Sequence, residues 1–285
     1  MKIAISNIAW RREEEEAVAG IMRELAIQGV EIAPSAVWPV PLVVTDADIA
    51  GYRRFWESRG IQIVALQALL FGRPDLTIFE NAETRRLTFD YLEAMIRLGG
   101  KLGAKVLVFG SPKNRRAGSL PPAEIEGIAV PFFGELGRAA KKNDIVFCIE
   151  PNPAAYKCDF ITTSGAGLEL VKKVGVEGFG LHLDAGGMTL STEPVDSTIH
   201  DAVVASSHFH ASEVNLAPVG SGSVDHKRFA TALSGANYNH WVSIEMRAQQ
   251  ERANLEQVKR ALKFVSAVYG RYESLATCCP VSEIG

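Results

Sequence analysis

Four short apolar segments each end in a side chain that can bind a metal ion or carry a proton. They are Ile145–Glu150, Phe179–Asp184, Ser206–His210 and Trp241–Glu245. Each segment is typical of a buried strand, and a carboxylate at the end of such a strand is costly unless a cation or another partner compensates its charge. Two glutamates, one aspartate and one histidine in one place favour a divalent-cation site rich in oxygen ligands.

These four terminal residues recur at a regular spacing. The intervals from Glu150 to Asp184, His210 and Glu245 in turn are 34, 26 and 35 positions. Each interval is about the length of one strand and one helix, so we expect the four residues at the carboxyl ends of consecutive parallel strands. Side chains alternate along a strand, and the alternation allows all four to point inward at one arc of a barrel rim.

The types of side chain limit which metal ions the site can bind and which reaction it can support. Three carboxylates and one imidazole suit Mn, Mg or Co better than Zn, and the absence of thiolate ligands argues against a structural zinc site. A bound cation would polarise a carbonyl and stabilise an enediolate. Glu150 and Glu245 could flank a substrate there, one removing a proton next to the carbonyl and the other returning it. We therefore predict one divalent metal ion, held by Glu150, Asp184, His210 and Glu245, with both glutamates also catalytic.

The rest of the sequence predicts the scaffold that positions these residues. Apolar strand-like runs alternate with amphipathic helical stretches, and we count eight strand–helix units. Such alternation implies a parallel sheet, and the number eight favours a single-domain α/β fold, the (β/α)8 TIM barrel. We assign the barrel to residues 1–270. Residues 271–285 are small and polar and include Pro280, so we expect a C-terminal tail outside the barrel with a composition typical of disorder.

Composition excludes several classes of protein. The chain has 285 residues, 47% of them hydrophobic, and a net charge of −3, which gives no electrostatic footprint for nucleic acid. No apolar run approaches the roughly 20 residues that span a bilayer, and the N-terminus lacks a signal-peptide layout. Four cysteines make no disulfide framework in a chain of this size, so we expect a cytoplasmic protein. A homo-oligomer is left open.

The motifs around the four residues carry a family resemblance. Glu150 lies in the segment Cys148–Asn152, Asp184 in His182–Gly186, His210 in Phe209–Glu213 and Glu245 in Ser243–Arg247. With about residues 1–270, these motifs resemble the xylose isomerase-like barrel superfamily of sugar isomerases and epimerases, and within it the ketose 3-epimerases. In that branch the matching residues bind one divalent metal ion and both glutamates carry protons. The resemblance implies a metal-dependent isomerase or epimerase whose small-molecule substrate is a sugar, a sugar phosphate or a keto-polyol.

Two positions depart from the ketose 3-epimerase pattern. A substrate-binding histidine commonly follows the Asp motif by three residues, and this position is Gly187 here. An arginine commonly follows the metal-binding histidine by six residues, and this position is Leu216. The resemblance therefore supports the metal and proton chemistry but does not support a ketohexose as the substrate.

Several side chains near the expected strand ends are candidates for binding the substrate. They are Gln67, Lys113, Arg115, Glu213 and Arg247. Lys113 and Arg115, in the loop Gly110–Arg116, can hold a phosphate, a carboxylate or sugar hydroxyls, or simply face solvent. We expect His182 and His208 one pleat below the metal ligands, as supporting or core residues. Glu31 is expected near the bottom of the barrel and is assigned no role.

Other functions remain as alternatives. A dehydratase (lyase) of keto-inositols in the same superfamily would share the metal and enolate chemistry but would eliminate a group instead of returning the proton. A barrel that binds a sugar without turning it over is less favoured. A relative that cleaves abasic nucleic acid would need further histidine and glutamate ligands for several zinc ions. Six histidines in the chain and its net negative charge argue against it.

Overall fold

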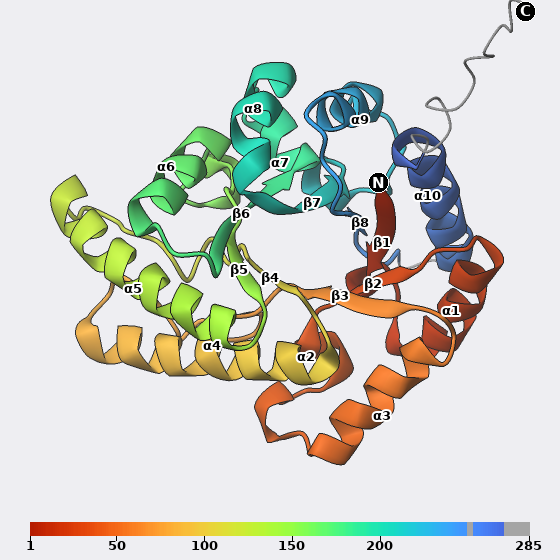
Figure 1. The fold of residues 1–285 in the computed structure, drawn as a ribbon, viewed down its shortest axis with the longest axis horizontal. Coiled ribbons are helices and arrows are strands. Elements are labelled where there is room, and N and C mark those ends of the chain that lie inside the picture. The colour runs from red at the N-terminus through yellow and green to blue at the C-terminus, as the bar shows by residue number, and fades with distance from the viewer. Residues whose placement is uncertain (250–252, 271–285) are drawn as a thin grey trace, which may run out of the picture.

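Eight parallel strands close into a barrel in the order of the sequence. The computed structural model describes residues 1–249 and 253–270. The strands are β1 (Lys2–Ser6), β2 (Gly29–Ile32), β3 (Gln62–Leu66), β4 (Val106–Phe109), β5 (Val146–Ile149), β6 (Phe179–Asp184), β7 (Ser206–Ser212) and β8 (Trp241–Glu245). Figure 1 shows the strands in the centre of the molecule and the helices around them. The predicted single-domain (β/α)8 barrel is confirmed.

Helices connect the strands on the outside of the barrel. The α-helices of the described residues are α1 (Glu15–Glu24), α2 (Pro34–Val37), α3 (Asp46–Glu57), α4 (Ala82–Leu102), α5 (Pro122–Lys142), α6 (Ser164–Val174), α7 (Ala185–Leu190), α8 (Val195–Ala202), α9 (His226–Gly235) and α10 (Asn254–Tyr269). The 3-10 helices are η1 (Asn7–Ala9), η2 (Arg12–Glu14), η3 (Pro41–Val43), η4 (Ala154–Tyr156), η5 (Val203–Ala205) and η6 (Val214–Leu216). Local signals set two of the helix ends: the Thr45 side chain caps the start of α3, and Gly103 ends α4 with φ of 88°.

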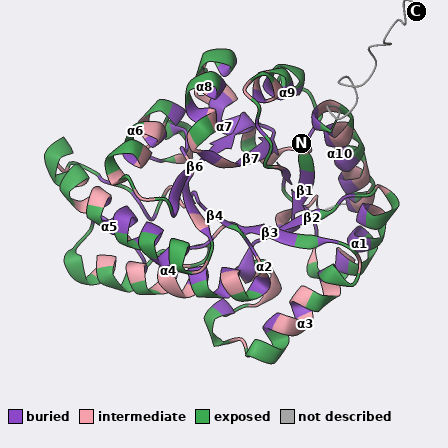
Figure 2. Cartoon of the chain, viewed as in Figure 1, coloured by how far each residue is buried: buried purple, intermediate pink, exposed green. Residues whose placement is uncertain are grey.

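Two separate apolar layers stabilise the barrel. The larger layer lies between the strands and the helices, and Figure 2 shows it as the buried strands and the inward faces of the helices. The smaller one consists of strand residues that include Ala4, Val64, Val108 and Cys148. Because side chains alternate along a strand, these residues face the barrel interior. They come from β1, β3, β4 and β5, so apolar packing fills that part of the interior.

Strands β5 to β8 bring polar side chains to the barrel mouth in register. Asp184 is the last residue of β6 and pairs with His210 of β7. Ser212, two residues further along β7, pairs with Glu245 at the end of β8. Glu150 directly follows β5, which neighbours β6. The closed register therefore brings the four predicted metal ligands to one end of the barrel.

Two short parts of the chain, 250–252 and 271–285, lie outside the described residues. The tail expected at 271–285 and its boundary at 270 thus stay predictions. Among the helices that are described, none is both long and apolar enough to cross a membrane.

Candidate metal-binding and active site

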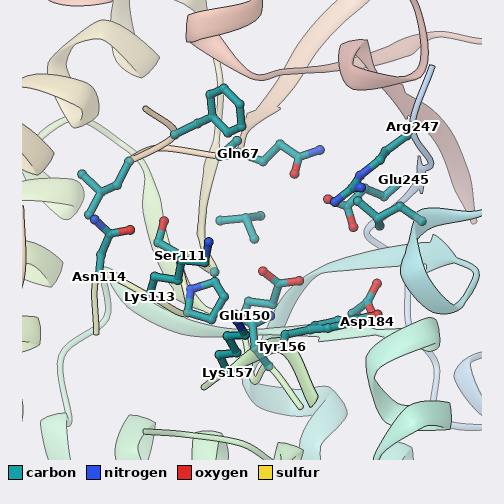
Figure 3. Close-up of a pocket in the computed structure, with 18 of the residues that line it drawn as sticks. Gln67, Ser111, Lys113, Asn114, Glu150, Tyr156, Lys157, Asp184, Glu245 and Arg247 are labelled. Carbon is teal, nitrogen blue, oxygen red and sulfur yellow. The ribbon is translucent and has the colours of Figure 1, made fainter. Parts of the chain in front are cut away.

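A cavity of about 700 Å³ opens at the carboxyl ends of the strands. Glu150, Asp184 and Glu245 reach it from β5, β6 and β8, and Figure 3 shows their carboxylates around one open space. This volume lies in the range of sites for small organic molecules. The cavity occupies the face of a (β/α)8 barrel where active sites form.

His210 lies fully buried next to this cavity and joins the carboxylates into one cluster. Its Nδ1 is 3.3 Å from Oε2 of Glu245. One donor atom each of His210, Glu150, Asp184 and His182 lie within 4.8 Å of one another. The structure therefore brings together all four residues predicted as metal ligands, and it adds His182 at their edge.

The Asp184 carboxylate is held by donors on both of its oxygens. The backbone N–H of Gly187 donates to Oδ1 at 2.5 Å, and the hydroxyl of Ser212 donates to Oδ2. Asp184 thereby caps α7, a short helix that the sequence analysis did not predict. A Cβ atom at position 187 would lie 2.9 Å from Oδ1, so a larger residue there would disturb this contact. Glycine at 187 is thus part of how Asp184 is positioned.

Burial and the closeness of the carboxylates to one another raise the pKa values of Glu150 and Asp184. Burial, with the nearby charges of Glu245 and Asp184, raises the pKa of Glu150 to about 8. Burial, with the charge of Glu245, raises the pKa of Asp184 to about 6. Negative groups that bind protons this tightly are also suited to a cation, which would displace the protons.

The imidazole of His210 also fits a metal ion at this site. Among the described residues, the buried His210 Nδ1 makes no well-aligned hydrogen bond, and its ion-pair partner is Glu245 Oε2 at 3.3 Å. A buried nitrogen without a well-aligned hydrogen bond is unfavourable, and a metal ion next to the three carboxylates would satisfy it. The residues present therefore fit a divalent cation bound by oxygen atoms and one imidazole.

Glu31 lies in a different place from the one expected from the sequence. It was expected near the barrel bottom with no role, but its buried carboxylate lies beside His210, 2.9 Å from Nε2. The same carboxylate accepts a hydrogen bond from Ser243 Oγ at 2.7 Å and lies 3.4 Å from His208 Nε2. The sequence did carry a signal for this contact, namely a glutamate inside the short apolar strand β2. Burying a charge there is costly, so Glu31 needs a partner in the interior.

The contact between Glu31 and His210 Nε2 determines which imidazole nitrogen, Nδ1, is directed toward the candidate metal site. Burial raises the pKa of Glu31, but the neighbouring His210 and His208 outweigh it and hold this pKa well below its ordinary value. Burial lowers the pKa of His210, but the charges of Glu31 and Glu245 outweigh it and hold this pKa well above its ordinary value. A metal ion at Nδ1 would displace the proton there, and the proton on Nε2 would still be donated to Glu31. Carboxylates behind metal-binding histidines commonly fix the tautomer and the ring orientation in this way. Of the two histidines expected to support the site, His208 contacts Glu31 and His182 packs against His210, with ring centroids 4.1 Å apart.

The candidate substrate-binding residues separate into two groups. Gln67, Lys113 and Arg247 line the cavity, as does Glu213. The Glu213 carboxylate, however, is occupied by the loop after β7, where it accepts hydrogen bonds from backbone N–H groups that include Val224 at 3.1 Å.

Arg115 is not among the residues that line the cavity, although it was also a candidate. It is fully buried, and its Nη2 donates to the carbonyl oxygen of Glu150 at 2.6 Å and to Oδ1 of Asn152 at 2.9 Å. The side chain thus supports the backbone that carries Glu150.

The loop after β5 contributes lining residues that the sequence analysis missed. They are Asn152, Ala155, Tyr156 and Lys157. Tyr156 accepts a hydrogen bond at its hydroxyl from the backbone N–H of Asn215, at 3.1 Å, which joins this loop to the loop after β7. The available signal was position alone, because the segment directly follows a strand that ends in a predicted ligand.

Strained backbone is concentrated around the cavity. Five of its lining residues other than glycine have a left-handed conformation, with φ between 43° and 62°: Ala68, Ser111, Lys157, Asn215 and Leu216. Each such conformation costs on the order of 1–3 kcal/mol and persists where the surrounding structure enforces it, commonly at functional sites.

The closed parallel barrel and its carboxylate-lined mouth place the protein in the class of (β/α)8 barrels. Its candidate site lies at the carboxyl ends of the strands, the face where such barrels have their active sites. The family model described as xylose isomerase-like TIM barrel matches residues 20–268. The chain belongs to this family, and the predicted resemblance is confirmed.

Individual proteins match this chain over most of their length. The chain is 23% identical over 252 residues to the probable ketose 3-epimerase of Synechocystis sp., which covers 86% of this chain and 84% of that protein. The solved structure of D-psicose 3-epimerase with D-tagatose from Clostridium cellulolyticum H10 matches with a TM-score of 0.79 at 17% identity, over 94% of this chain and 99% of the other. The IOLI protein with a bound zinc atom matches with a TM-score of 0.75 at 17% identity, over 96% and 100%. The two structural likenesses show the shared fold.

Proposed function

We propose that this protein is a divalent-metal-dependent isomerase or epimerase of a keto sugar that moves a proton at the carbon next to the carbonyl. One observation carries the proposal. Glu150 and Glu245 come from β5 and β8, which are not neighbours, and both reach the same cavity with Asp184 and His210 between them. Two carboxyl groups on different sides of one space are what the transfer of a proton from one face of a carbon to the other requires.

Glu150, Asp184, His210 and Glu245 would hold the metal ion. When bound, the ion would hold the substrate oxygens and stabilise negative charge that develops on the carbonyl oxygen. Oxygen-rich ligands favour manganese, magnesium or cobalt, although zinc is found in the structure of the IOLI protein.

The chain itself supplies the proton carriers and their positioning. One glutamate removes the proton from the substrate carbon, and the other delivers a proton from the opposite side. Arg115 fixes the backbone carbonyl of Glu150, and Gly110 leaves room for its carboxylate, because a Cβ there would collide with Oε2. Gln67 and Arg247 line the cavity and carry hydrogen-bonding groups that can bind substrate hydroxyls. A pKa of Glu150 that burial raises to about 8 keeps a carboxylic acid available near neutral pH before a cation binds.

The relatives support epimerisation in particular. The probable ketose 3-epimerase of Synechocystis sp. and the D-psicose 3-epimerase from Clostridium cellulolyticum H10 carry this activity in their names. Glycine at 187 and leucine at 216 leave the identity of the sugar open. The expected cytoplasmic location and a homo-oligomer stay predictions.

The test is turnover of a panel of ketoses by metal-free protein and by protein loaded with manganese. We expect activity only with metal, and losses of roughly 1000-fold or more in Glu150→Gln and Glu245→Gln, since each removes a proton carrier that the other cannot replace. Glu135→Gln, at an exposed position of α5, is the matched control.

The products decide between the proposal and its alternatives. An epimer or isomer of unchanged mass supports the proposal. A product that has lost water would instead indicate a dehydratase, and tight binding without any turnover would indicate a binding barrel. Full activity of the metal-free protein would contradict the proposed mechanism.

A further inference from the structure

We infer that the cavity binds a keto sugar with an anionic substituent, a phosphate monoester or a carboxylate, and that Lys113 and Lys157 form the subsite for this group. The inference rests on the proposed function, because it concerns the substrate of the same site. It is carried by the charges around the cavity and by the way in which the two lysine loops are fixed.

A bound divalent metal ion makes the net charge of the cavity lining positive. The basic lining residues are Arg73, Lys113, Lys157 and Arg247, and the acidic ones are Glu150, Asp184, Glu213 and Glu245. Four charges of each sign cancel when all the carboxylates are ionised. A divalent cation adds two positive charges, and Asp75, which pairs with Arg73, offsets one of them, so an excess of one positive charge remains. A neutral sugar would leave this excess uncompensated in a partly enclosed space, whereas an anionic group would neutralise it.

The acidic residues of the lining already have partners. They therefore do not neutralise the positive charge of the two lysines. Three of the carboxylates belong to the candidate metal site, and Glu213 accepts hydrogen bonds from the loop after β7 and pairs with His226 at 3.3 Å. Arg73 pairs with Asp75 at 2.6 Å. Within the described residues, none of Lys113, Lys157 and Arg247 takes part in an ion pair. Arg247 lies beside Glu245, which leaves the two lysines as the basic groups without a carboxylate beside them (Figure 3).

Both lysines lie on one side of the cavity. Lys113 belongs to the loop after β4 and Lys157 to the loop after β5, which are neighbouring strands. Figure 3 shows them on the side of the cavity away from Glu245 and Arg247. A substrate whose carbonyl end lies at the metal-binding carboxylates can therefore reach the lysines with its other end.

The loop that carries Lys113 is anchored on both sides of this residue. Asn114 Nδ2 donates to the backbone carbonyls of Arg73 and Leu76, each at 2.7 Å, and Arg115 is buried against Glu150. Ser111 has φ of 43°, a conformation that costs energy and that the anchored loop maintains. The side chain of Lys113 is left at the cavity, while its neighbours are fixed beneath it.

The loop that carries Lys157 is fixed in a similar way. Lys157 itself has φ of 62°, and the hydroxyl of the preceding Tyr156 is bound to the backbone of Asn215. Holding a lysine backbone in this unfavourable conformation serves no apolar packing, because the residue is exposed. It does place a flexible ammonium group at the rim. Two lysines acting as point charges suit a tetrahedral phosphate, whereas a planar carboxylate is more often held by a bidentate arginine.

The test compares three ketoses of equal chain length that carry a terminal hydroxyl, carboxylate or phosphate. The proteins are the manganese-loaded wild type, Lys113→Ala, Lys157→Ala and the double variant. Lys172→Ala, which removes an exposed lysine of α6 paired with Glu169, is the control. In the wild type we expect kcat/KM to be highest for an anionic ketose. Each lysine variant should lower the preference for it over the neutral ketose by roughly tenfold, mainly through KM, as expected for one charge-assisted hydrogen bond.

The outcomes separate this inference from the proposed function. If the wild type turns over the neutral ketose as well as or better than both anionic ones, the anion subsite is wrong and the proposed function stands. A preference for phosphate or for carboxylate identifies the anion. If no ketose is turned over, the proposed function fails, and calorimetry with inorganic phosphate still tests the subsite. Equal phosphate affinity of the wild type and the double variant would overturn it.

Discussion

The metal-free protein should lose stability as the pH rises from about 5 to about 8, and Glu150→Gln should remove much of this loss. Burial and neighbouring charges raise the pKa of Glu150 from an ordinary value of 4.5 to about 8. Between these values the folded protein holds a proton that the unfolded chain releases. The free energy of unfolding therefore falls as the pH rises through this range. The glutamine amide of the variant carries no such proton.

The size of the effect follows from these two pKa values. The difference between 4.5 and about 8 corresponds to about 5 kcal/mol, at 1.36 kcal/mol for each pKa unit. The Glu150 carboxylate faces the cavity, however, and water there reduces the penalty to roughly 2–3 kcal/mol. Asp184, whose pKa is raised to about 6, adds to the loss in the same direction and is present in both proteins.

The assay is urea unfolding of both proteins in a chelator at pH of about 5, 6.5 and 8. We expect the free energy of unfolding of the wild type to fall by roughly 2–3 kcal/mol more than that of Glu150→Gln over this range. Glu135→Gln, the control in α5, should follow the wild type. Parallel curves for the wild type and Glu150→Gln would refute the reasoning that crowding and burial raise the proton affinity of Glu150. Added manganese should stabilise the wild type most at high pH, where the metal displaces fewer protons.

Three further substitutions test the positioning of the site. Glu31→Gln should weaken manganese binding by roughly 10–100-fold in calorimetry, because His210 loses the carboxylate that orients it; an unchanged Kd would contradict this role. Gly110→Ala should lower kcat while the circular dichroism spectrum stays the same, since its Cβ meets Glu150; wild-type kcat would argue against the geometry given for that carboxylate. Glu213→Gln should speed amide hydrogen exchange of Gly220, Gly222, Ser223 and Val224, whose N–H groups donate to this carboxylate, with a cost of about 1–3 kcal/mol in local stability; unaltered exchange would show that Glu213 does not hold the loop.

The fold and the four central residues could be predicted because short-range patterns encode them. Each of Glu150, Asp184 and Glu245 ends a short apolar strand, and a charged side chain in that place is costly enough to stand out. The spacing of one strand and one helix then determines which end of the barrel they share. Two helix boundaries are equally local. The side chain of Thr45 caps the start of α3, and the left-handed backbone of Gly103 ends α4.

The remaining parts of the site depend on contacts between distant segments. Glu31 lies 179 positions from His210 in the sequence, and only closure of the barrel brings their side chains together. Arg115 was expected in the cavity because its loop lies at the correct end, but the turn of that loop directs it beneath Glu150 instead. The helix α7 carries two glycines in six residues and lacks a periodic pattern, so only the capping by Asp184 reveals it.

Incorporation of solvent deuterium tests the central claim most directly, namely that Glu150 and Glu245 carry protons to and from opposite faces of one carbon. With the ketose that the wild type turns over, reaction in heavy water should place one deuterium at the inverted carbon of the product. Glu150→Gln and Glu245→Gln should both lose epimerisation, and each should still exchange the proton of one epimer, a different epimer for each variant. A product without deuterium, or normal epimerisation by either variant, would contradict the account.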